Sequence, residues 1–279
     1  MPAMEATPAH EILFVPQQFP TIQAAVDAAS GPTTIMVVPD LYAESVHVVD
    51  KPYVVIQSTR LSRRGVTICG DGGLTVLYVE RSTLHLSGIE VRSKARSRGL
   101  SVMGSSLSLQ ECVIADNRVG EDADEPFGGG MLCRDSRVRI QKSVITGNVV
   151  DGGAAAATAG GGGLFFQNCQ IESAGCTVQG NAVYATSHAA GGGIWCERST
   201  LRLWRSRVTE SALHAPLCEG AGISFKAPLD CQLGGSVITG NGSPRGRGGG
   251  VFIEGDRSRV NIHRNTVVRQ NHPTDIDFG

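Results

Sequence analysis

The stretch that decides the fold spans residues 191–196 and reads Gly-Gly-Gly-Ile-Trp-Cys. Variants of it recur along the second half of the chain, where a Gly-rich triplet precedes a short, mostly apolar segment. The residues that directly follow the triplets lie 33, 30, 29 and 28 residues apart, and they are Met131, Leu164, Ile194, Ile223 and Val251. A self-similar unit at a nearly fixed period is typical of repeat architectures, in which each unit stacks on its neighbours.

Two earlier units lack the glycine triplet but share the rest of the pattern. Residues 77–84 read Leu-Tyr-Val-Glu-Arg-Ser-Thr-Leu, close to Ile-Trp-Cys-Glu-Arg-Ser-Thr-Leu at 194–201. The next unit begins at Leu100, only 23 residues after Leu77. The shortest unit therefore has about 22–23 residues, and the longer ones carry insertions before the triplet.

Each unit contains three short segments in which apolar and polar residues alternate, a pattern that predicts β-strands. Like residues recur at like positions, so they should stack above one another. Three strands per turn and stacked interior rows predict an all-β, right-handed parallel β-helix of about nine coils. A meander or sandwich would need hairpin turns such as Asn-Gly between its strands, and the sequence does not supply them at that frequency.

A row of asparagines follows the third strand of each unit. It consists of Asn117, Asn148, Asn181, Asn241 and Asn271, and it is interrupted only by Ser211. The interpretation is structural: the amides form a ladder at one corner of the coils.

The N-terminal segment differs from the repeats. Residues 21–29 have a helical pattern between Pro20 and Gly31-Pro32, and this helix should cap the open end of the solenoid, where exposed strand edges invite aggregation. The predicted organisation is a disordered tail over residues 1–11, a cap with the helix over 12–34, and a single β-helix domain over 35–279.

Composition excludes several function classes. The formal net charge is −1, which argues against non-specific nucleic-acid binding. No apolar run approaches the roughly 18 residues of a membrane span, so no membrane partner is expected. The first eleven residues show no signal peptide, which predicts a cytoplasmic protein unless a leader was removed. The eight cysteines contain no CxxC and are interpreted as buried, unpaired thiols.

Two segments near the N-terminus resemble the start of pectin lyase-like superfamily proteins. They are Phe-Pro-Thr-Ile-Gln-Ala-Ala-Val at 19–26 and Val-Val-Pro-Asp-Leu-Tyr-Ala-Glu-Ser-Val at 37–46, where Asp40 replaces the usual glycine of the family. The glycine triplets and the Val-Ile-x-x-Asn units are similar to the repeat of the same superfamily, over residues 12–271. The resemblance implies the β-helix fold. It leaves activity open, because the superfamily includes polysaccharide-processing enzymes and non-catalytic scaffolds, and the catalytic motifs of its polygalacturonases, methylesterases and epimerases are not found.

The candidate ligand-binding residues lie on the outward face of the sheet formed by the first strands. Four of the seven residues in one outward row are aromatic in a chain with only 5% aromatics: Tyr78, Phe165, Trp195 and Phe252. Sugars stack on aromatic rings, so this row predicts carbohydrate binding. Two alternatives are that the inserted loops cover the row or that another subunit does.

The next outward row supplies the candidate catalytic residues. Glu197 and Glu254 would act as acid and base, with Lys226 or Arg134 stabilising charge. The alternative is a solvated ladder of opposite charges. If the protein is an enzyme, this set suits a polysaccharide lyase or glycoside hydrolase acting on an acidic polysaccharide.

No cofactor is expected, although the first insertion holds four acids that would suit calcium: Glu121, Asp122, Asp124 and Glu125. Solvated acids are the favoured interpretation, because the alternating ligand pattern of a dedicated calcium loop is absent. The function predicted overall is binding or processing of a polysaccharide or oligosaccharide. The alternative is a non-catalytic scaffold or self-assembling interaction module, with a homo-oligomer as partner.

Overall fold

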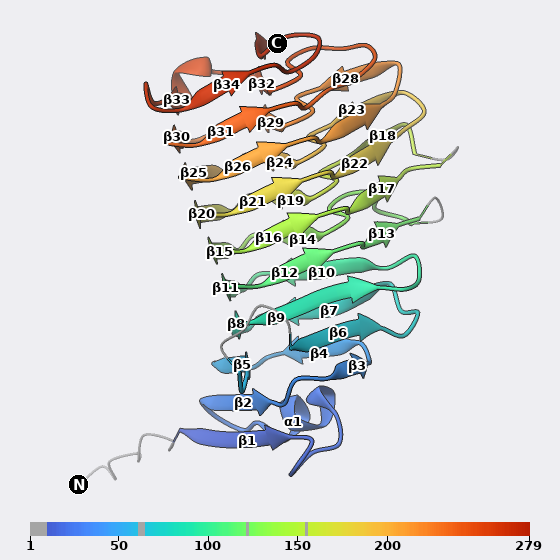
Figure 1. Ribbon diagram of the computed structural model, residues 1–279, viewed down its shortest axis with the longest axis vertical. Coiled ribbons are helices and arrows are strands. Elements are labelled where there is room, and N and C mark those ends of the chain that lie inside the picture. Colours follow the sequence, from blue (N-terminus) through green and yellow to red (C-terminus); the bar gives the residue numbers. More distant parts are fainter. Residues whose placement is uncertain (1–9, 61–64, 121–122, 154–155) are drawn as a thin grey trace, which may run out of the picture.

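The computed structural model describes residues 10–60, 65–120, 123–153 and 156–279. The chain winds upward in coils, and every paired strand lies parallel to its neighbours in three long sheets (Figure 1). The winding is right-handed, as expected for crossovers between parallel strands. The prediction of an all-β, right-handed parallel β-helix is confirmed.

The three long sheets, named A, B and C, contain ten, nine and nine strands. Sheet A consists of β1 (Glu11–Val15), β2 (Thr33–Val37), β5 (Val54–Ser58), β8 (Thr83–Ser87), β11 (Ser106–Gln110), β15 (Arg137–Gln141), β20 (Gln170–Ala174), β25 (Thr200–Trp204), β30 (Cys231–Gly234) and β33 (Val260–Ile262). Sheet B consists of β3 (Leu41–Ala43), β6 (Val66–Gly70), β9 (Ile89–Ser93), β12 (Val113–Ala115), β16 (Val144–Thr146), β21 (Thr177–Gln179), β26 (Arg207–Thr209), β31 (Val237–Thr239) and β34 (Val267–Arg269). Sheet C consists of β4 (Val46–Val49), β7 (Thr75–Glu80), β10 (Arg98–Met103), β14 (Met131–Arg134), β19 (Leu164–Gln167), β24 (Ile194–Glu197), β29 (Ile223–Lys226), β32 (Val251–Glu254) and β35 (Ile276–Phe278). The number of coils differs slightly from the expected nine.

The insertions before the glycine triplets are not simple loops. They form two further parallel sheets, D and E, beside the C-terminal half of the solenoid (Figure 1). Sheet D contains β13 (Arg118–Val119), β17 (Val149–Asp151), β22 (Ala182–Tyr184) and β27 (Ala212–His214). Sheet E contains β18 (Thr158–Gly160), β23 (His188–Ala190) and β28 (Leu217–Glu219). The coils that carry insertions are therefore wider than those near the N-terminus, and they enclose a second core of small and aliphatic side chains.

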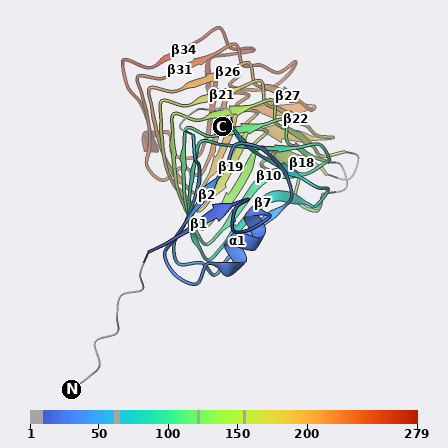
Figure 2. The same ribbon diagram turned by 60° about the horizontal axis from the view of Figure 1, so that its bottom comes forward.

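The capping helix is present as α1 (Ile22–Ala28) at the N-terminal end of the solenoid (Figure 2). Thr21 is its N-cap, and its hydroxyl accepts a hydrogen bond from the backbone N–H of Ala24 at 3.1 Å. The Glu44 carboxylate accepts the N–H groups of Ile22 and Gln23, each at 2.9 Å. The predicted tail falls largely on residues 1–9, outside the described residues, and the proposed domain boundaries stay a prediction.

The asparagine row forms the predicted ladder. Asn148 Nδ2 donates to Asn181 Oδ1 at 3.0 Å, and Asn148 Oδ1 in turn accepts the side-chain and backbone N–H groups of Asn117. At the C-terminal end Asp275 replaces the next asparagine, because its Oδ1 accepts both N–H groups of Asn271 at 3.0 Å. Each ladder member also donates to a strand carbonyl, so the buried amide N–H groups at this corner are satisfied, and Asn117 Oδ1 at the first position is the one ladder oxygen among the described residues without a partner.

All eight cysteines are buried and unpaired, as expected. Burial raises the pKa of the thiols of Cys112, Cys169 and Cys231 to about 11. Cys133 and Cys196 face the interior of the coils, where burial also raises the pKa of both thiols. Because the thiolate is the reactive form, these side chains act as small apolar core groups.

The thiols should therefore resist alkylation in the folded protein. With excess iodoacetamide at pH 8, mass spectrometry should find the native chain unmodified over a time in which glutathione reacts fully, and eight adducts after unfolding in guanidinium. Modification of any native thiol at the rate of glutathione would show that the coils open locally at that position.

Candidate functional site

The aromatic row predicted to bind ligand is not exposed. Phe165, Trp195 and Phe252 have exposed fractions of only 2%, 3% and 1%. Rings this deeply covered present no face to a sugar, so the prediction of an exposed aromatic surface on sheet C is wrong for these three residues. Tyr78 alone stays half-buried, and its hydroxyl donates to Glu80 Oε2 at 3.1 Å.

The chain itself supplies the cover, which is one of the two alternatives considered above. Phe127 from the first insertion packs on Phe165 and Trp195, with ring centroids 4.8 Å and 5.6 Å apart. The indole of Trp195 also lies against Gly160 of β18, where any Cβ would overlap it. At the other end, Gly279 lies over the ring of Phe252, after the C-terminal strand β35. Phe165 and Trp195 therefore belong to a small core between sheet C and the inserted segments.

The candidate catalytic residues do lie together. The strand register places Glu197 beside Lys226 and Lys226 beside Glu254, on the adjacent strands β24, β29 and β32. Glu197 is paired with Arg198 at 3.1 Å, and its side chain is 15% exposed. Arg134 lies two strands before Glu197 and is paired with Glu125 at 2.5 Å. The arrangement is that of a charged ladder, and the catalytic role of these four residues stays a prediction.

The acidic insertion shows no calcium cage in the part that is described. Glu121 and Asp122 lie outside the described residues, and Glu125 pairs with Arg134. Among the described residues, no group of three or more His, Cys, Asp or Glu side chains is placed to hold a metal ion.

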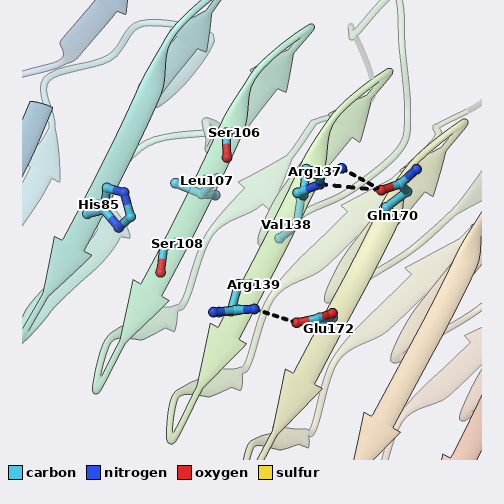
Figure 3. A pocket seen from close by; sticks show the side chains of 9 residues that line it. All are labelled: His85, Ser106, Leu107, Ser108, Arg137, Val138, Arg139, Gln170 and Glu172. Carbon is cyan, nitrogen blue, oxygen red and sulfur yellow. Dashed lines mark hydrogen bonds and ion pairs between the residues drawn. The ribbon is translucent and has the colours of Figure 1, made fainter. Parts of the chain in front are cut away.

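The outward face of sheet A is open and hollowed (Figure 3). A hollow of about 430 Å³ lies across β8, β11, β15 and β20. Small Ser106 and Ser108 form its floor, and His85 stands on one side of them. Arg137 and Arg139 stand on the other side. The hollow arises because two serines lie between larger side chains on the neighbouring strands.

Two smaller hollows continue along the same face, each of about 260 Å³. They share Arg202 and Glu172 as walls, and the larger hollow shares Glu172 with both. From β8 to β25 the hollowed face crosses five strands, which corresponds to about 19 Å at the usual strand spacing. This length fits a short stretch of a linear polymer.

Aromatic rings stand at both ends of the hollowed face. Tyr53 lies 5.1 Å from His85 at the N-terminal end, and Trp204 lies 5.1 Å from His263 at the C-terminal end, measured between ring centroids. Trp204 is half-buried and rests on the backbone of Gly234, where a Cβ would overlap the indole. Because Gly234 has no side chain, the indole of Trp204 can lie on the strand and serve as a stacking platform.

The charge of the face comes from arginine. The Arg137 guanidinium donates to Gln170 Oε1 at 3.3 Å and 3.1 Å, and Arg139 Nη2 donates to Glu172 Oε2 at 2.8 Å (Figure 3). Burial lowers the pKa of His85 and so favours the neutral imidazole. Arginines present forked donors that match carboxylate groups, and the hydroxyl and amide side chains around them suit sugar hydroxyls.

This face lies on the second strand of each unit, whereas the site predicted from the sequence uses outward residues of the first strands. The signal was present: Arg137, Arg139 and Arg202 occupy outward positions of second strands, and Trp204 is an aromatic residue at an equivalent position. These residues belong to different coils, so no local motif joins them in the sequence.

The fold defines the class of protein: a right-handed parallel β-helix. Among solved structures, the chain is similar to a pectin methylesterase variant in complex with a hexasaccharide, at 11% identity and a TM-score of 0.43, covering 94% of this chain and 84% of that one. It is similar to the pectin methylesterase of Aspergillus niger, at 14% identity and a TM-score of 0.41, covering 98% and 90%. It is also similar to the pectin methylesterase PemA of Erwinia chrysanthemi, at 11% identity and a TM-score of 0.33, covering 98% and 88%.

At these identities the similarity concerns the architecture. No protein-family model and no curated protein matches the chain. Within the described part of the chain, no helix has the length and apolar character needed to cross a membrane.

Proposed function

We propose that the protein binds an acidic polysaccharide or oligosaccharide along the outward face of sheet A. The observation that carries this proposal is the continuous row of three hollows, lined by Arg137, Arg139 and Arg202 and ended by the Trp204 platform. Guanidinium groups bind carboxylates, and an amphipathic indole stacks on the apolar face of a sugar. The aromatic binding site predicted on sheet C is thus replaced by one on the neighbouring sheet.

The strongest support is the combination of three features on one exposed surface. Elongated hollows suit a linear ligand, and exposed arginines suit an acidic one. The small residues Ser106, Ser108 and Ala174 keep the floor low, so that a chain of sugars lies close to the backbone. The surface needs no rearrangement of the coils to admit the ligand, and this rigidity favours binding.

The charged ladder of Glu197, Lys226, Glu254 and Arg134 is kept as the proposed acid–base set of any processing activity. Only two residues separate Glu197 from Thr200, which lines the third hollow. Cleavage of the bound polysaccharide should therefore be tested in the same experiments. New reducing ends would indicate hydrolysis, and new unsaturated ends would indicate a lyase reaction.

Replacing both Arg139 and Arg202 by glutamine should weaken binding of oligogalacturonate about tenfold or more, because two charge-assisted hydrogen bonds are lost. Trp204→Ala should weaken it several-fold through loss of stacking, at about 1 kcal/mol. The measurement is titration calorimetry at low and moderate salt, with binding of the parent protein weakening as salt rises.

The matched control is Arg118→Gln, which removes an exposed arginine from sheet D, where it pairs with Asp151 at 2.5 Å. This variant should bind as the parent does. Equal affinity for oligogalacturonate and a neutral glucan, or equal loss with Arg118→Gln, would contradict the site. Tighter binding of an oligonucleotide of equal charge would favour a nucleic-acid ligand instead.

The second candidate is the self-assembling scaffold, and it is favoured by the two ends of the solenoid. The terminal strands β1 and β35 expose large apolar side chains, namely Ile12, Phe14, Ile276 and Phe278. Unpaired strand edges of this kind promote association. The scaffold function would be supported over the proposed one if the protein bound no glycan and sedimented as an oligomer at micromolar concentration.

A further inference from the structure

The outward face of sheet A carries a row in which the sign of charge changes from strand to strand. The strand register places Ser108 beside Arg139, Arg139 beside Glu172, Glu172 beside Arg202, and Arg202 beside Gln232. Two cationic positions are thus separated by one anionic position, and a neutral polar residue lies at each end. Like charges lie two strand spacings apart, which is about 10 Å along the axis of the solenoid.

The charged groups of this row are accessible to a ligand. The side chains of Arg139, Glu172 and Arg202 are 58%, 52% and 50% exposed. Arg139 pairs with Glu172 at 2.8 Å, and Arg202 lies 3.8 Å from Asp230. Exposed ion pairs of this kind are weak, so the guanidinium groups can turn toward an incoming carboxylate.

The position of Glu172 is the informative one. It lies between the two arginines and lines all three hollows, so any chain that contacts both arginines must pass over it. A carboxylate accepts hydrogen bonds from sugar hydroxyls or from an amide N–H, and it repels a second carboxylate placed above it. If the face bound only ligands in which every sugar is acidic, a carboxylate between the two arginines would weaken that binding.

We propose that sheet A selectively binds a polysaccharide in which acidic and neutral sugars alternate; this inference rests on the proposed function. The chain lies along the solenoid axis, and each sugar covers roughly one strand spacing. Acidic sugars lie over Arg139 and Arg202, while the neutral sugar between them donates hydroxyl or amide hydrogens to Glu172. Ser108 and Gln232 provide neutral polar contacts on the next strands at either side.

The experiment compares two ligands of equal length at one ionic strength. One alternates glucuronate with N-acetylglucosamine, and the other is oligogalacturonate, in which every sugar is acidic. Titration calorimetry of the parent protein should give an affinity for the alternating chain about tenfold higher, although it carries half the charge.

The variant Glu172→Gln isolates the cause of the selectivity. It removes the repulsion at the central position and should raise the affinity for oligogalacturonate about fivefold, while changing that for the alternating chain less than about twofold. The matched control is Glu111→Gln, which removes a partly exposed carboxylate outside the row, where it lies 3.8 Å from Lys142. This control should leave the ratio of the two affinities unchanged.

The outcomes separate the two proposals. If both ligands bind equally, or if Glu172→Gln raises both affinities by the same factor, the selectivity is overturned and the binding site on sheet A stands. If neither ligand binds the parent protein, or if the double substitution of Arg139 and Arg202 changes nothing, the proposed function itself fails.

Discussion

Alanine in place of Gly163 is expected to lower the free energy of unfolding by about 3 kcal/mol. The Cβ would lie 2.6 Å from the carbonyl oxygen of Gly193 and 3.1 Å from the amide of Asn181. The Gly193 carbonyl accepts the backbone N–H of Leu164 at 2.9 Å, so it cannot move away without breaking the ladder between two coils. The asparagine is equally fixed, because its amide is part of the buried row.

This result would be distinctive because a glycine-to-alanine change ordinarily stabilises, by about 0.4–1 kcal/mol, where space and backbone permit. The matched control is Gly242→Ala at the same corner, where the nearest atoms to the Cβ lie 3.5 Å and 3.6 Å away. Urea denaturation followed by circular dichroism should show a large loss for Gly163→Ala and nearly no loss for Gly242→Ala. Equal midpoints for the two variants would mean that the coils are not packed as tightly as described.

Asn148→Ala should have an effect of similar size, a loss of about 3 kcal/mol or more. Asn148 Nδ2 donates to the Ile114 carbonyl and to Asn181 Oδ1, each at 3.0 Å, and its Oδ1 accepts two N–H groups of Asn117. Truncation leaves these buried groups without partners, and each unpaired buried group costs about 1–3 kcal/mol. The same denaturation experiment measures the loss.

Two other substitutions test whether the hydrogen bonds of the asparagine ladder cause this loss of stability. Asn261→Ala removes an exposed asparagine of β33 outside the ladder, and it should change stability by less than about 0.5 kcal/mol. Ser211→Asn fills the interruption, where the serine is too short to supply the amide oxygen, and should add about 1 kcal/mol. A stabilising effect of Asn148→Ala, or a large loss with Asn261→Ala, would contradict the interpretation of the ladder.

The repeat made the architecture predictable from the sequence. The glycine triplets, the asparagine row and the alternation within each unit are local features repeated at nearly equal spacing. Stacking identical positions is the arrangement that satisfies all of them together. Gly163 illustrates this: it lies against Gly193 and Asn181 of the next coil, and both are its neighbours in the repeated pattern. The capping helix was predictable because its signals are local and lie within residues 20–32.

The sequence did not reveal which outward surface is open. Alternation along β24 correctly places Cys196 inside and Trp195 outside the coil, yet it carries no information about segments that fold across the outer surface. The cover comes from Phe127 and Gly160, which precede Trp195 by 68 and 35 residues. Their positions depend on how the insertions pair into sheets D and E.

The sequence by itself determined that the chain coils, which residues fill its interior and where the polar corner ladder lies, because these follow from period and spacing. Only the tertiary structure decided that Phe165, Trp195 and Phe252 of sheet C are buried and that Arg139, Glu172 and Arg202 form one row on sheet A. Insertions of unequal length separate those three residues by 33 and 30 positions. Their juxtaposition is therefore a property of strand register, which is set by backbone hydrogen bonds between coils.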